Sequence, residues 1–152
     1  MNTDMSLMNQ AEYDDDYSTC AKTYSTLRVF ANEINPMEIT KTLGISPTES
    51  FQKGELHSKG LSRKANGWFY STAKLTQSKD TRRHIDLILS ALDRKEEAIE
   101  VLHQKGCKLD ITSYWVSHGQ GGPALWPHQM IKLGTLGIEV WWDIYFAHEG
   151  ET

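Results

Sequence analysis

The stretch from residue 107 to residue 146 constrains the fold of this chain more than any other. It is predicted to form a strand, a glycine-rich loop, a short helix and a final strand that is dense in aromatic side chains. Side chains of a strand alternate between its two faces. One face of the final strand is apolar and is expected to join a core: Ile138, Val140, Trp142, Ile144 and Phe146. The other face holds Glu139, Trp141, Asp143 and Tyr145. What covers this second face is expected to decide the function.

Length and composition favour one globular domain. The chain has 152 residues, of which 39% are hydrophobic and 24% charged, and this is enough for an ordinary core. The net charge of −4 arises in residues 1–22, where five acidic residues accompany one lysine; the other 15 acidic and 15 basic residues cancel. A body without excess positive charge argues against nucleic acid as a partner.

Residues 1–22 are expected to form an acidic mobile tail, and residues 23–148 a single globular domain. The tail has no apolar period and no hydrophobic region typical of a secretory signal. The chain contains no run of 18 apolar residues, so no membrane partner is expected. Cys20 and Cys107 are the only cysteines and have no motif spacing, which indicates reduced thiols and a cytoplasmic location.

Hydrophobic periodicity predicts strands alternating with helices. The strands are expected over residues 24–31, 68–72, 107–118 and 138–146. The helices are expected from Asn35-Pro36 to Gly44, over 81–105 with a break near Asp93, and over 124–133. Residues 46–66 are expected to form a long loop. Each helix has one apolar stripe, which favours an α+β fold: a two-layer sandwich with a mostly antiparallel sheet of about four strands and helices on one face. A parallel doubly wound sheet is less favoured, because its strands would be apolar on both faces.

A set of short motifs adds a family resemblance. In order, they are Asn35-Pro36-Met37-Glu38-Ile39-Thr40, Leu43-Gly44-Ile45-Ser46-Pro47-Thr48, Lys53-Gly54, Gly67-Trp68, Leu136-Gly137-Ile138 and Asp143-Ile144-Tyr145. Together they cover about residues 24–146 and resemble the bacterial family known as domain of unknown function 4279. The resemblance implies a small cytoplasmic bacterial α+β domain. It implies no established activity, cofactor or catalytic residue.

The outer, aromatic face of the sheet is the leading candidate for a functional surface. Tyr, Trp and Arg are enriched at binding hot spots, and the predicted partner-binding residues are Arg28, Tyr114, Trp141, Asp143 and Tyr145. The leading hypothesis is a non-enzymatic protein-binding or regulatory module, most simply a two-fold homodimer. The alternative is that residues 1–22 or the 46–66 loop cover these rings and form a second small core.

An enzyme or small-ligand-binding protein is the other class to weigh. A hydrolase or ligand pocket would use Arg28, Asp110, His118 and Asp143. It requires these groups to converge within hydrogen-bond reach of one another or of one substrate atom. No catalytic residue is assigned, since the chain has no Gly-x-Ser-x-Gly motif and Cys107 is expected in the core.

No cofactor or metal is predicted either. His118, His128 and Asp143 could in principle bind a metal ion, but they have no spacing typical of a zinc site. The glycine-rich loop at residues 119–123 lacks the lysine and hydroxyl residues of a phosphate-binding loop, so a flexible turn is the better interpretation.

Overall fold

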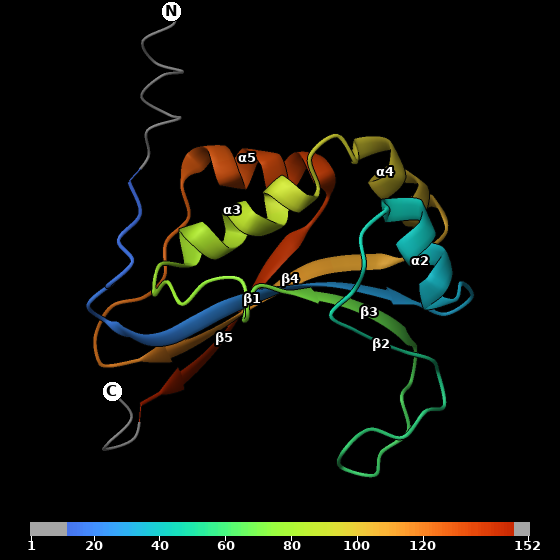
Figure 1. The fold of residues 1–152 in the computed structure, drawn as a ribbon, viewed down its shortest axis with the longest axis horizontal. Coiled ribbons are helices and arrows are strands. Elements are labelled where there is room, and N and C mark those ends of the chain that lie inside the picture. The colour runs from blue at the N-terminus through green and yellow to red at the C-terminus, as the bar shows by residue number, and fades with distance from the viewer. Residues whose placement is uncertain (1–11, 148–152) are drawn as a thin grey trace, which may run out of the picture.

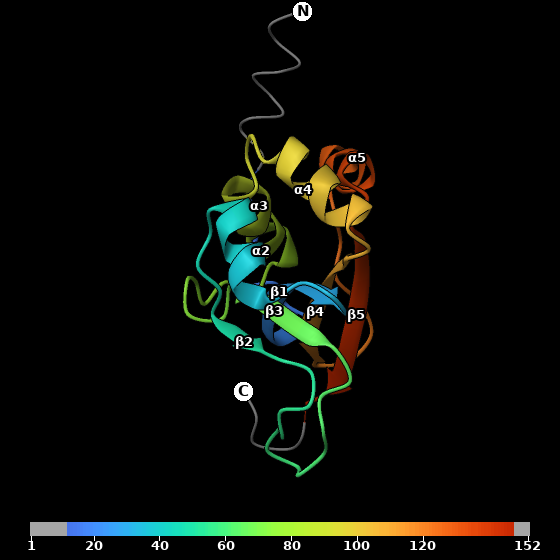
Figure 2. The same ribbon diagram turned by 90° about the vertical axis from the view of Figure 1, so that its right-hand side faces the viewer.

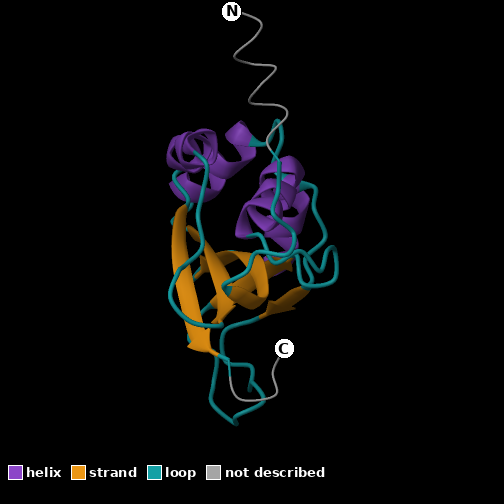
Figure 3. Cartoon of the chain, turned by 90° about the vertical axis from the view of Figure 1, so that its left-hand side faces the viewer, coloured by secondary structure: helices purple, strands orange, loops and turns teal. Residues whose placement is uncertain are grey.

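Four helices lie on one face of a five-stranded sheet in the computed structural model, which describes residues 12–147 (Figure 1). The elements in chain order are β1 (Cys20–Ala31), α2 (Pro36–Leu43), β2 (Glu49–Phe51), β3 (Asn66–Ser71), α3 (Thr81–Ala91), α4 (Glu96–Gln104), β4 (Lys108–Ser117), α5 (Pro127–Leu136) and β5 (Glu139–Phe146). Seen from the side in Figure 3, the helical layer stands above the sheet. The predicted two-layer α+β sandwich is confirmed.

The sheet is mixed and has the strand order β2-β3-β1-β4-β5. β1 pairs antiparallel with β3 and β4, and β2 pairs antiparallel with β3. β5 pairs parallel with β4, because α5 carries the chain back across the sheet between them. The predicted mostly antiparallel sheet is therefore confirmed, with β4–β5 as its one parallel pairing, and it has five strands where about four were expected. The additional strand β2 has three residues, too few to give a periodic signal within the 46–66 loop.

Local signals in the sequence place most helix ends correctly. The Asn35 side chain accepts a hydrogen bond of 2.9 Å from the amide of Met37 at the start of α2, and Gly44 ends this helix with φ = +67°. The predicted 81–105 helix is broken as expected, and Arg94 adopts a positive φ of 61° in the break. The last helix begins at Pro127, three residues after the predicted start at Ala124, because proline suits the first helical turn.

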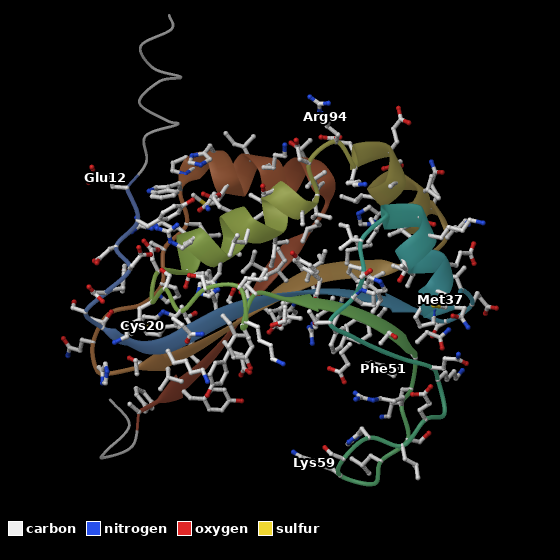
Figure 4. All side chains as sticks on the ribbon, viewed as in Figure 1. Glu12, Cys20, Met37, Phe51, Lys59 and Arg94 are labelled. Atoms are coloured by element: carbon white, nitrogen blue, oxygen red, sulfur yellow. The ribbon has the colours of Figure 1, made fainter. Side chains whose placement is uncertain are left out.

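The core lies between the helical layer and the sheet, where side chains fill the space seen in Figure 4. Its fully buried members come from every layer: Leu27, Val29 and Ile111 from the strands, and Ile85, Ile88 and Ile99 from the helices. Trp68 of β3 is also fully buried, and its indole donates a hydrogen bond of 3.0 Å to the Thr40 hydroxyl of α2. Because the core occupies the sheet face toward the helices, the opposite face of the sheet points away from them.

The described part of the N-terminal segment contacts the helical layer. The Asp15 carboxylate accepts hydrogen bonds of 2.7 and 2.9 Å from Arg83 of α3, and the Tyr17 hydroxyl donates to the carbonyl of Gly122 at 2.9 Å. β1 begins at Cys20, inside the predicted tail. Residues 12–22 are thus held against the body, whereas residues 1–11 of the predicted tail lie outside the described residues. No helix between residues 12 and 147 is long and apolar enough to cross a membrane.

Candidate functional site

The sheet face opposite the helices, called here the outer face, brings together the residues predicted from the sequence. The strand registers set Tyr24 of β1 beside Tyr114 of β4, and Tyr114 beside Asp143 of β5. The same registers set Thr26, Thr112 and Trp141 side by side, and likewise Arg28, Asp110 and Glu139. In Figure 2 the helices lie on the other side of the sheet, and the β2–β3 connection projects below this face.

A row of tyrosine rings crosses the outer face. Tyr24 and Tyr114 are stacked with ring centroids 4.9 Å apart, and Tyr114 contacts Tyr145 at 5.4 Å. Burial raises the pKa of Tyr24. A hydrogen bond from the Tyr145 hydroxyl to Asp143, 3.3 Å long, raises the pKa of Tyr145. Both groups therefore remain neutral hydroxyl donors at physiological pH.

The pair Arg28–Asp110 anchors the centre of this face. The guanidinium donates two hydrogen bonds of 2.8 and 3.0 Å to the Asp110 carboxylate, whose side chain is only 2% exposed. Arg28 also lies 5.1 Å from the centre of the Phe30 ring. Because each charge already has its partner, the pair joins β1 to β4, and Asp110 is not available as a free catalytic base.

β5 is exposed to a greater extent than its sequence pattern predicts. Trp141 and Tyr145 of the outer face are 54% and 50% exposed, as expected for an open face. On the predicted core side, only Ile138 and Val140 reach the core. Trp142, Ile144 and Phe146 remain 38%, 50% and 78% exposed, so their predicted burial is wrong. The reason is visible in Figure 1: β5 is an edge strand that runs away from the helical layer toward its C-terminal end.

The alternative pocket is not assembled. Asp110 and Asp143 lie at different positions along the β4–β5 pair, because Asp110 is opposite Glu139 whereas Asp143 is opposite Tyr114. His118 follows Asp110 by eight residues along an extended chain, a separation of about 26 Å at strand spacing. Arg28, Asp110, His118 and Asp143 therefore do not converge on one substrate atom. In the described part of the chain, no group of three or more His, Cys, Asp or Glu side chains is placed to hold a metal ion.

The loop between β2 and β3 forms a cleft that the sequence analysis missed. Its volume is about 950 Å³, and its lining includes Phe30, Phe51, Lys53, His57, Arg63 and Lys64. The Arg63 guanidinium lies 3.8 Å above the Phe51 ring, and Figure 4 shows Lys59 at the loop tip. In the sequence, the basic residues Lys53, Lys59, Arg63 and Lys64 are equally typical of solvated loop charge, so they do not by themselves indicate a cleft. Its positive groups could hold an anionic group of a ligand.

Of the two predicted covers, neither the 46–66 loop nor the described residues 12–19 lie over the exposed rings of β5. The cleft loop lies next to β2 and β3, at the opposite side of the sheet from β5. Residues 12–19 contact α3 and the loop before α5 instead. Among the residues that the structure describes, the rings of Trp141 and Tyr145 are thus open to solvent.

The fold and this surface together define a class: a small α+β sandwich with helices on one sheet face and an open aromatic face on the other. A family model described as domain of unknown function (DUF4279) matches residues 21–147, and the chain belongs to this family. The match confirms the resemblance seen in the motifs. Comparisons with curated proteins and with solved structures found no match.

Proposed function

We propose that this protein is a non-enzymatic protein-interaction or regulatory module that binds through its outer face and, most simply, associates with a second copy. The observation that carries the proposal is the open pair Trp141 and Tyr145, 54% and 50% exposed beside the tyrosine row. Aromatic surface of this kind, rimmed by polar groups, is typical of contact sites. The contact residues are Arg28, Tyr114, Trp141, Asp143 and Tyr145.

These residues have different roles in the proposed contact. Trp141 and Tyr145 supply apolar area with few rotatable bonds, so that little side-chain entropy is lost on binding. Asp143 and Glu139 border them with negative charge, which favours one orientation of the partner more than it raises affinity. Arg28 is held by Asp110 and presents a fixed guanidinium at the centre of the face.

Two further points support a binding role over catalysis. The four polar residues of the enzymatic alternative are spread along the strands, whereas a binding surface needs only contiguous aromatic area. A small anionic ligand would find its positive partners in the β2–β3 cleft rather than near Arg28 and His118. A bacterial, cytoplasmic setting belongs to this proposal, and the buried free thiols of Cys20 and Cys107 are compatible with it.

The variant Trp141→Asp tests the proposal by placing a charge within the aromatic surface. Light scattering should give twice the chain mass for the parent and the single-chain mass for the folded variant. The control is Met37→Asp, a change at a 74% exposed side chain on α2, which should remain a dimer. Circular dichroism checks that both variants are folded. A parent that is monomeric at every concentration, or a variant that stays dimeric, would contradict the proposal.

A further inference from the structure

The free edge of β5 is the strongest unassigned feature of the described residues. β4 lies on one side of β5, and the sheet ends on the other. The amide of Ala147 donates a hydrogen bond of 2.8 Å to the carbonyl of Ser117 at the end of β4. Backbone groups alternate in direction along a strand. The amides and carbonyls of Val140, Trp142, Ile144 and Phe146 are therefore directed at the free edge.

Exposure on both faces of β5 favours the edge over the outer face as a contact site. Trp141 and Tyr145 are half-exposed on the outer face, while Trp142, Ile144 and Phe146 are exposed on the opposite face. A partner seated on the outer face alone would cover only the first two. The edge is the one place that borders all five side chains. Natural edge strands are commonly protected by proline, by charged side chains, above all lysine, or by a bulge. Over Glu139–Phe146, β5 has no proline, lysine or bulge, and its two charged residues, Glu139 and Asp143, both lie on the outer face.

We propose that β5 is a strand-addition edge, which pairs antiparallel with β5 of a second copy about a two-fold axis at Trp142. This inference rests on the proposed self-association and narrows the contact to β5: Trp141, Asp143 and Tyr145 take part in it, whereas Tyr114 and Arg28 lie one and two strands behind the edge. One continuous sheet then runs through both chains. The edge-directed amides and carbonyls bond across the axis, and the exposed side chains on both faces of β5 gain cross-strand neighbours.

The polar side chains of β5 favour a second copy as the partner. Along the outer face they alternate as acceptor, donor, acceptor and donor: Glu139, Trp141, Asp143 and Tyr145. With Trp142 opposite itself, Glu139 faces the partner's Tyr145, and Asp143 faces the partner's Trp141. Every carboxylate then meets a donor. Within one chain the same donors already bond these carboxylates, at 2.9 Å from Trp141 to Glu139 and 3.3 Å from Tyr145 to Asp143.

Other pairings of the edge are less favourable. An axis at Asp143 would set this carboxylate opposite the same group of the partner, and like charges directly opposite are destabilising. Head-to-tail pairing of β5 with β2 would engage only the three residues of β2, against eight in β5. It would also form an open chain of copies unless its rotation closed into a ring, whereas the two-fold arrangement closes with two copies.

Ile144→Lys separates edge pairing from contact through the outer face alone. Ile144 lies on the face opposite Trp141, so its replacement should dissociate the dimer only if the partner occupies the edge. We expect the single-chain mass by light scattering for Ile144→Lys and a dimer for the control Ile131→Lys, at a 70% exposed side chain of α5. If Trp141→Asp is monomeric while Ile144→Lys remains a dimer, the edge pairing is wrong and the proposed function stands. If the parent itself is a monomer, both fail.

A cross-linking experiment keeps the inference testable even if Ile144→Lys does not fold. Trp142→Cys places two thiols opposite each other at the axis, whereas the two thiols of Phe146→Cys would be about 26 Å apart at strand spacing. The native thiols of Cys20 and Cys107 are buried. Under mild oxidation we expect the Trp142→Cys dimer to form at least tenfold faster than the Phe146→Cys dimer. Equal rates would mean random collisions and would overturn the proposed register.

Discussion

At the scale of single residues, the ion pair between Arg28 and Asp110 is the buried polar contact nearest the proposed surface. Replacing Arg28 with Met keeps the apolar stem and leaves the Asp110 carboxylate, 2% exposed, without a counter-charge. We expect a loss of about 2–3 kcal/mol in the free energy of unfolding, below the full range for buried pairs because Arg28 keeps 28% of its side-chain exposure. Urea denaturation measures this loss.

A double variant provides the control for that prediction. Replacing both partners, Arg28→Met with Asp110→Leu, removes the uncompensated charge and should recover much of the lost stability. If Arg28→Met alone changes the free energy of unfolding by less than about 0.5 kcal/mol, the pair is not the structural link that its geometry indicates.

The buried His84 is expected to make the free energy of unfolding depend on pH. Its ring is fully buried, and its Nε2–H donates to the Ser78 carbonyl at 2.8 Å, so Nδ1 accepts from the Thr72 hydroxyl. Burial lowers the pKa of His84 below its ordinary value of 6.5. The unfolded chain thus binds this proton more readily than the native protein. The stability contribution is complete above pH 6.5 and is lost as the pH falls toward the native pKa.

The corresponding experiment compares urea midpoints at pH 7.5 and pH 5. The parent should lose stability over this interval, and His84→Gln, although less stable at pH 7.5, should lose less. Asp15 titrates at lower pH, because its hydrogen bonds from Arg83 lower its pKa. An equal fall of the midpoint in both proteins would show that His84 does not control the pH dependence.

At the scale of elements, α3 is the main helical support of the core. Its register decides which of its apolar side chains are fully buried and therefore contribute most to the free energy of unfolding. Ile85 and Ile88 are fully buried, whereas Leu89 is only half-buried against the core. Ile88→Ala should therefore reduce the free energy of unfolding by about 2–5 kcal/mol, and Leu89→Ala by about 1 kcal/mol. Thermal and urea unfolding of both variants would check the order. A larger loss for Leu89→Ala would contradict the observed register.

The elements also show what a sequence pattern can and cannot predict. Alternation along residues 138–146 predicted which side chains share a face of β5, and this is confirmed by the register with β4. It could not predict burial, because burial needs an opposing layer, and the helices do not cover the C-terminal half of β5. β2 is too short to show a period, and it pairs with β3 only through long-range contacts.

At the scale of the whole molecule, the sequence was enough to predict the two-layer architecture but not the position of β5 at the edge of the sheet. One apolar stripe per helix was enough to predict helices on one side of a sheet, and the registers place Arg28, Tyr114, Trp141, Asp143 and Tyr145 on the other side. The parallel pairing of β5 depends on how α5 crosses over, which local periodicity does not encode. The cleft likewise depends on how residues 52–65 fold back toward Phe30.

The central claim is that two copies meet at β5, and amide hydrogen exchange of the parent protein tests it most directly. In dilute solution, the edge-directed amides of Val140, Trp142, Ile144 and Phe146 should exchange quickly. At high concentration they should become protected, whereas the alternate amides, already bonded to β4, should change little. This concentration-dependent protection at every second residue is the predicted result. Exchange at these four amides that is equally fast at both concentrations would contradict the account.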